Sequence, residues 1–155
     1  KQAIVTAQQS ATSARQNLVL ENAEGISAST GAVFDFNHNN VWANTGTNYG
    51  AGLGTVGVLD WLNCFGTECD QFYNLSVDPR FVDADGPDND AETVGDNDYR
   101  LAADSLCIDA GNPTDPFANE LEDNGDLVNI GLHGNTAAAR TQLPRSLAGS
   151  DRDAD

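Results

Sequence analysis

Basic side chains are scarce in this sequence, and lysine is almost missing, since Lys1 is the only one. Lys and Arg together number 7, against 24 Asp and Glu residues, which gives a formal net charge of −17. A chain with this charge repels phosphate backbones instead of attracting them. The charge therefore excludes nucleic acid as an expected partner.

Long apolar runs are missing as well. The sequence contains no run of about 18 apolar residues, so we expect no transmembrane segment. Its aromatic content of 7% comes without a basic amphipathic face that would bind an anionic membrane surface. With 155 residues and 39% hydrophobic residues, the chain has the size and the apolar content of one domain with a packed core.

Methionine is absent altogether, and the sequence begins at Lys1. We therefore expect a processed or excised piece of a longer protein. Asp, Asn, Gly and Thr are abundant while lysine is not, and this composition favours a secreted bacterial or archaeal protein over a cytosolic enzyme. The expected localisation is extracellular or at the cell surface.

Cysteine occurs at three positions. Cys64 and Cys69 are close in sequence, so we expect them to form a disulfide around a small loop in an oxidising compartment. The alternative is a metal site, but this spacing, with Cys107 remote and only His38 and His133 available, matches no regular zinc pattern. Cys107 stands between two aliphatic residues and is expected to be a buried thiol.

Two segments of the sequence match at an offset of 22 residues: residues 17–22 and 39–44 both read Asn-x-Val-(Leu/Trp)-x-Asn. A period of about 20 to 25 residues is typical of one coil of a β-solenoid, whose turns stack at about 4.8 Å. Asparagines repeated at one corner would form a side-chain ladder. Residues 31–36 alternate in polarity as a strand does, and polar turn residues follow.

The composition changes at about residue 76. Residues 78–126 hold fifteen acidic residues and two basic ones, Arg80 and Arg100, and short apolar runs interrupt them. We expect loops with brief strands here. The predicted organisation is an N-terminal segment with solenoid coils over 1–75, an acidic loop-rich cap over 76–146, and a linker or tail over 147–155.

Five segments carry a resemblance to a known family. They are Asn-Val-Trp-Ala-Asn-Thr-Gly (40–46), Asp-Pro-Arg-Phe-Val-Asp (78–83), Asp-Tyr-Arg-Leu (98–101), Ser-Leu-Cys-Ile-Asp-Ala-Gly (105–111) and Val-Asn-Ile-Gly-Leu-His-Gly-Asn-Thr (128–136). In this order they resemble the C-terminal end of secreted bacterial right-handed parallel β-helix proteins of the pectate-lyase-like superfold. The resemblance covers roughly residues 16–146. It implies an all-β fold whose residues before about 75 are the last coils of a parallel β-helix, while the acidic cap closes its end.

The acidic segment concentrates oxygen donors in short loops, and calcium prefers such donors at irregular geometry. So many carboxylates repel one another unless a cation neutralises them. We therefore predict calcium binding; an EF-hand loop starting at Asp83 is excluded, since Asp88 and Val94 stand where glycine and glutamate are required. The predicted metal ligands are Asp83, Asp85, Asp88, Asp90, Asp96 and Asp98.

The expected function is an extracellular structural or adhesive β-solenoid module, calcium-stabilised, within a cell-surface assembly or filament. A first coil without a neighbour leaves unpaired backbone groups along its edge. We expect that edge to be covered by a second subunit stacked on it, by upstream coils of a longer parent chain, or by a helix formed by the first fifteen residues.

The alternative function is binding or degradation of a polysaccharide. Trp42, Trp61 and Tyr73 could stack on sugar rings if exposed, or pack inside the solenoid if buried. A lyase needs a basic residue on the coils, and residues 16–75 contain no Lys or Arg. A hydrolase needs two carboxylates, for which Asp35 and Asp60 qualify by residue type alone. We therefore name no catalytic residue.

Overall fold

The computed structural model describes residues 12–29, 34–121 and 124–141. Over these ranges the protein is all-β and contains no helix, which confirms the predicted fold class at that level. The strands are β1 (Thr12–Arg15), β2 (Leu18–Leu20), β3 (Phe34–Asn37), β4 (Asn40–Trp42), β5 (Trp61–Leu62), β6 (Glu68–Cys69), β7 (Phe81–Asp83) and β8 (Asp98–Leu101). The predicted tail 147–155 lies outside the described residues.

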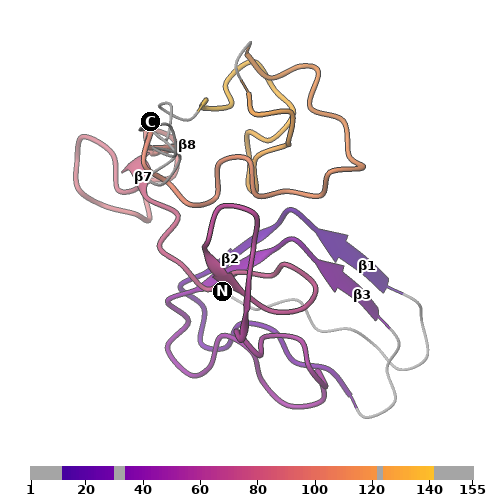
Figure 1. The fold of residues 1–155 in the computed structure, drawn as a ribbon. Helices are drawn as coiled ribbons and strands as arrows, with labels where there is room; N and C mark the ends of the chain where they lie inside the picture. Colours follow the sequence, from indigo (N-terminus) through magenta and orange to yellow (C-terminus); the bar gives the residue numbers. More distant parts are fainter. Residues whose placement is uncertain (1–11, 30–33, 122–123, 142–155) are drawn as a thin grey trace, which may run out of the picture.

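Parallel pairing organises the first half of the chain (Figure 1). β1 pairs with β3 and β2 with β4, and Val19 lies directly opposite Val41. Partner residues in both pairs are 22 positions apart, so the offset of the sequence match is the register of the structure. Single parallel bridges join Ile26 to Tyr49 and Asn40 to Leu75. We call residues 12–29 the first layer, 34–51 the second layer and 70–77 the third layer.

Five corners of these layers share one local design: a residue in the left-handed conformation is followed at once by an asparagine. The left-handed residues have φ between 51° and 62°; they are Gln16, Glu21, His38, Ala43 and Tyr73. At the first four of these corners the asparagine Nδ2 donates to the carbonyl oxygen two residues earlier, as when Asn39 Nδ2 donates to the carbonyl oxygen of Asn37 at 2.8 Å. This hydrogen bond offsets part of the strain, which costs about 1 kcal/mol for a residue other than glycine.

Three of these asparagines form a ladder across the layers. The backbone N–H and Nδ2 of Asn17 both donate to Asn39 Oδ1 at 3.0 Å, and those of Asn39 donate to Asn74 Oδ1 at 3.0 Å. The ladder ends at Asp70, whose Oδ1 accepts the backbone N–H of Asn74 at 2.9 Å. Asn39, Asn74 and Asp70 are fully buried, so these bonds satisfy groups that water does not reach.

A second ladder runs along the next corner. The backbone N–H of Asn22 donates to Asn44 Oδ1 at 3.0 Å, and that of Asn44 donates to Asn48 Oδ1 at 3.1 Å. Asn48 Nδ2 then donates to the hydroxyl of Ser76 at 2.8 Å. In both ladders the asparagines of the first two layers therefore donate to a polar side chain further along the sequence. Asn17, Asn22 and Asn39 bond in this way to the following layer, whereas Asn44 bonds to Asn48 of its own layer.

The interior of the layers is apolar because alternate strand residues point inward. The inward side chains pack with two residues from the loop between the second and third layers; the cluster comprises Val19, Ile26, Phe36, Val41, Leu53 and Val56. Gly57 lets this loop approach, since its φ is +83° and an added Cβ would lie 2.1 Å from the Tyr49 ring. The Gly57 N–H donates to Asp70 Oδ2 at 2.7 Å, which fixes the loop to the end of the first ladder.

The acidic segment packs around a second apolar core. β7 and β8 pair antiparallel, and the long loops that follow them pack around a second apolar cluster. This cluster comprises Cys69, Leu75, Leu101, Cys107, Ile108, Ala110 and Ile130, with Leu18, Val77 and Phe81 packed against it. Leu18 and Leu75 belong to the layers, so the two halves of the protein share this core.

The acidic segment lies against the side of the layers, whereas the expectation was a cap over their end. Asp115 forms an ion pair with Arg15 of the first layer at 2.9 Å, and Asn112 Nδ2 donates to Asn37 of the second layer at 3.2 Å. Asn40 Nδ2 also donates to the sulfur of Cys107 at 3.3 Å. The physical reason is that the side chains on the outward face of β2 and β4 are apolar or fully buried. Another part of the chain therefore has to cover this face along its length.

Candidate functional site

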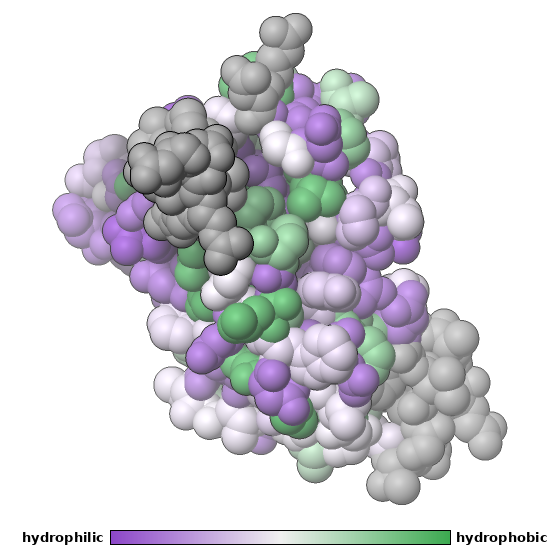
Figure 2. Space-filling model, viewed as in Figure 1, coloured by the Kyte–Doolittle hydropathy of each residue, from purple (hydrophilic) through white to green (hydrophobic). Residues whose placement is uncertain are grey.

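A groove runs along β2, between the first layer and the acidic segment. One part, which we call the edge groove, measures about 360 Å³ and is lined by Gln16, Asn17, Leu18, Leu20, Phe81, Tyr99, Gly131 and Leu132. The adjoining part, the Trp42 groove, measures about 430 Å³ and is lined by Leu20, Glu21, Trp42, Asp78, Pro79, Arg80, Phe81, Ala84 and Ala102. Figure 2 shows apolar surface gathered in the middle of this face, where the two halves meet.

Strand alternation builds the floor of the edge groove. Val19 points into the interior of the layers, so its neighbours Leu18 and Leu20 point outward. The rings of Phe81 and Tyr99 meet edge to face, with centroids 5.3 Å apart, and form one wall. The N–H of Gly131 donates to the carbonyl oxygen of Gln16 at 3.1 Å, which holds the opposite wall beside the first layer.

The Trp42 groove combines one aromatic side chain with charged groups. Trp42 ends β4 and is 37% exposed. Arg80 enters from the acidic segment, and its Nη2 lies 3.0 Å from Asp104 Oδ2. Glu21 and Asp78 line the same groove, so acidic groups outnumber the basic one. Such a surface suits a neutral ligand better than an anionic one.

The other two predicted carbohydrate-binding residues lie elsewhere. Trp61 on β5 is 56% exposed, and Tyr73 is 45% exposed and stacked on His38 with ring centroids 5.1 Å apart. All three aromatic residues are therefore on the surface, and neither Trp61 nor Tyr73 lines the groove.

Three of the predicted calcium ligands, Asp83, Asp85 and Asp98, lie near one another. Desolvation and a hydrogen bond with Asp85 raise the pKa of Asp83, and the charge of Asp98 acts in the same direction. Arg100 lowers the pKa of Asp98 to about 2, because its Nε donates to Asp98 Oδ1 at 2.8 Å. Asp98 therefore has a basic partner in Arg100. Asp83 and Asp85 repel each other and have no such partner in the described ion pairs.

The remaining predicted ligands are spread over exposed turns. Asp88 Oδ1 accepts the backbone N–H of Asp90 at 3.0 Å, and Asp90 Oδ1 accepts that of Glu92 at 3.0 Å. Asp96 is exposed on the next turn. No group of three or more His, Cys, Asp or Glu side chains in the described part of the chain is arranged to hold a metal ion. Calcium binding stays a prediction.

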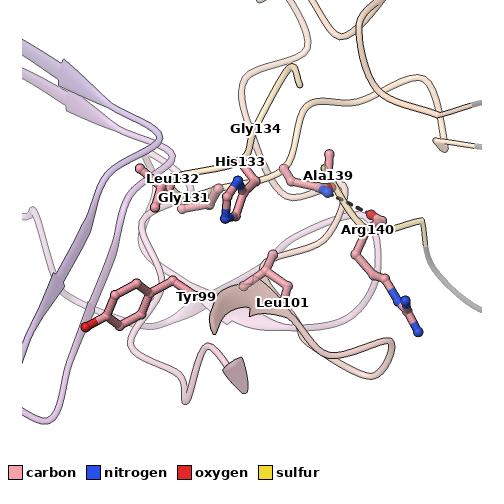
Figure 3. Close-up of a pocket in the computed structure, with 10 residues that line it drawn as sticks. Tyr99, Leu101, Gly131, Leu132, His133, Gly134, Ala139 and Arg140 are labelled. Atoms are coloured by element: carbon pink, nitrogen blue, oxygen red, sulfur yellow. Dashed lines mark hydrogen bonds between the residues drawn. The ribbon is translucent and has the colours of Figure 1, made fainter. Parts of the chain in front are cut away.

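A small pocket beside β8 contains His133 (Figure 3). Its lining includes Tyr99, Leu101, Gly131 and Arg140, and the carbonyl oxygen of Arg140 accepts a hydrogen bond from Asn129 at 2.7 Å. The pocket holds only about 10 Å³, which is room for about one water molecule. It is too small to be a substrate site.

No protein-family model, curated protein or solved structure matches this chain. Among the residues that the structure describes, none forms a helix long and apolar enough to cross a membrane. Any function therefore has to be inferred from the groove, the layers and the acidic loops themselves.

Sequence reasoning missed most of the groove, although a signal for it was present. Residues 18–20 read Leu-Val-Leu, so both faces of β2 are apolar. A strand of this kind has to be covered on both sides. The pattern could have indicated that another part of the chain lies against the outward side.

The three cysteines are free thiols, so the predicted Cys64–Cys69 disulfide is not formed in this structure. β5 and β6 form a hairpin that places Cys69 opposite Trp61, with its side chain in the second core. Cys64 lies in the turn of that hairpin and is exposed. Cys107 is fully buried, as expected.

The thiols should differ sharply in reactivity. Burial raises the pKa of Cys107 to about 12, and burial together with Asp70 raises the pKa of Cys69, so neither forms much thiolate at pH 8. A thiol-specific reagent should label one cysteine quickly in the native protein and all three after unfolding, and Cys64→Ser should remove the fast phase. Absence of a fast phase, with one reactive thiol after unfolding without reductant, would instead establish the disulfide.

Proposed function

We propose that the chain is an extracellular structural or adhesive module built as a right-handed parallel β-helix. The observation that carries this proposal is the parallel pairing of the first two layers, which has the same offset of 22 residues in both strand pairs. The two asparagine ladders support it, because side chains at equivalent corners stack one above the other. The composition, with abundant Asp, Asn, Gly and Thr and almost no lysine, supports a secreted or cell-surface location.

We further propose that calcium stabilises the acidic loops. The first support is that desolvation and the neighbouring Asp85 raise the pKa of Asp83. The second is that neither carboxylate takes part in the described ion pairs. A divalent cation between them would remove this repulsion. Carboxylate oxygens are the ligands that calcium prefers, and short exposed turns can adjust to its irregular coordination.

Thermal unfolding tests the calcium proposal. Calcium at about a hundred times its dissociation constant should stabilise the protein by about 2.7 kcal/mol, which raises the Tm by roughly 5 °C or more relative to a chelator. Asp83→Asn should reduce this shift, while Asp60→Asn, an exposed carboxylate outside the acidic segment, should leave it unchanged. An identical Tm in calcium and in chelator would remove calcium from the proposed function.

The second candidate function is binding of a neutral polysaccharide in the Trp42 groove. The specific observation is a partly exposed tryptophan on the side wall of a groove of about 430 Å³ whose charged groups are mainly acidic. Tryptophan side chains present a flat apolar face that can stack on a sugar ring. Cleavage of the polymer is a weaker proposal, since Asp35 on β3 and the exposed Asp60 line neither part of the groove.

Electrophoresis through gels that contain neutral or acidic polysaccharides tests this second function. Retardation by a neutral polymer is expected, and Trp42→Ala should weaken it by about tenfold, equivalent to about 1.4 kcal/mol. Trp61→Ala is the matched control and should change nothing. Equal retardation of the wild type and Trp42→Ala, or no retardation by any polymer, would reject the Trp42 groove as a sugar site. Release of new reducing or unsaturated ends would favour an enzyme over a structural module.

A further inference from the structure

The two ends of the asparagine ladders are chemically different. At the third layer the first ladder is closed, because the Asp70 carboxylate accepts hydrogen bonds from Asn74, Phe72 and Gly57. The second ladder passes from Asn48 to Ser76 at the same end. These acceptors are satisfied by residues of their own or the adjoining segment, so this end offers no ladder position to another strand.

The first layer is open by comparison. Asn17 and Asn22 donate to the second layer, and neither Oδ1 accepts a hydrogen bond from any described residue. In the layers below, the equivalent oxygens of Asn39 and Asn44 each accept two donors. The first layer therefore presents two amide oxygens, five residues apart, that match the donors of one further layer.

The backbone of β2 is open on the same side. The carbonyl oxygen of Asn17 accepts the N–H of Asn40, so it points toward the second layer. Along a strand the backbone groups alternate in direction, and the N–H and carbonyl of Leu18 therefore point away from that layer. No described residue forms a hydrogen bond with them. The edge groove lies beside this strand, since Asn17, Leu18 and Leu20 line it.

We propose that this open edge binds an extended peptide that carries two asparagines five residues apart and adds to β2 as a parallel strand. The register of the peptide is set by backbone hydrogen bonds with Leu18 and by its two asparagines, which donate to Asn17 Oδ1 and Asn22 Oδ1. Apolar side chains between the asparagines stack on Leu18, Leu20 and Leu132 in the edge groove. The inference rests on the proposed parallel β-helix and specifies what that module takes as its partner.

The direction of the hydrogen bonds in the ladders favours a separate peptide at this edge over a second copy of the same chain. Stacking the first layer of one copy on the third layer of another would require free donors at the third layer, where Asp70 closes the ladder. Placing two first layers face to face would bring amide oxygens against amide oxygens, without donors between them. A separate Asn-x-x-x-x-Asn segment supplies the missing donors, as residues 17–22 do for residues 39–44.

A labelled synthetic peptide with the sequence of residues 15–24 tests the proposal by fluorescence anisotropy against the full chain. Saturable binding is expected, with affinity at least tenfold lower for a peptide in which both asparagines are alanine. Leu18→Pro in the protein should abolish binding, because proline removes the outward N–H. Leu18→Ala, which removes the same packing against the second core but keeps that N–H, is the matched control and should retain binding. Leu132→Lys, at a side chain 70% exposed, should weaken binding without disturbing the fold.

Three results would overturn the proposal: no binding, equal binding of the two peptides, or a concentration-dependent dimer of the protein alone that the peptide disperses. The last result would assign the edge to a second copy. Amide hydrogen exchange on the same samples shows whether such a result contradicts only the peptide-binding edge or also the proposed parallel β-helix. Slow exchange at Val41 and Leu75, whose N–H groups bond to neighbouring layers, would show that the layers exist and that only the edge assignment is wrong.

Discussion

The structure depends on one constraint, which is that equivalent backbone positions 22 residues apart lie one above the other. Each turn reaches that position by a left-handed residue, at a cost of about 1 kcal/mol for a residue other than glycine. The asparagine that follows bonds to its own turn and to the neighbouring layer. Removing such a side chain would leave buried donors and acceptors unpaired, at about 1–3 kcal/mol for each group. Asparagine at these corners therefore specifies both the turn and the register.

The register determines where the rest of the chain can pack. Because Val19 and Val41 point inward, Leu18 and Leu20 point outward, and apolar residues on both faces of β2 require a cover on each side. The acidic segment supplies the outer cover with Phe81, Cys107 and Ile130, while most of its carboxylates stay on exposed turns. Like charges are thereby kept apart in water, although Asp83 and Asp85 interact with each other. The groove remains where this cover does not reach the edge of the first layer.

The repeated Asn-x-Val motif was enough to predict β2, β4 and their parallel register, since stacked identical residues leave a direct trace in the sequence. Residues 12–15 and 34–37 pair just as regularly but share no motif, because backbone pairing does not require identical residues on the two strands; Ser13, for example, lies opposite Asp35. Asp70 could not be recognised as the end of a ladder, since a carboxylate in that role differs from surface aspartates only in its burial. The lateral position of the acidic segment also escaped prediction, because it follows from Leu18 and Leu20 and not from any feature of the acidic residues themselves.

Disulfide trapping tests the parallel register most directly. Ser13 and Asp35 are exposed partners on β1 and β3, and the Ser13 hydroxyl lies 3.3 Å from Asp35 Oδ2. In a Cys64→Ser background, the pair Ser13→Cys and Asp35→Cys should oxidise readily. The pair Ser13→Cys and Asn37→Cys, two positions out of register, should not, because its Cα atoms would lie more than about 7 Å apart. Equal oxidation of both pairs, or preference for the second, would contradict the stacked layers and every inference that rests on them.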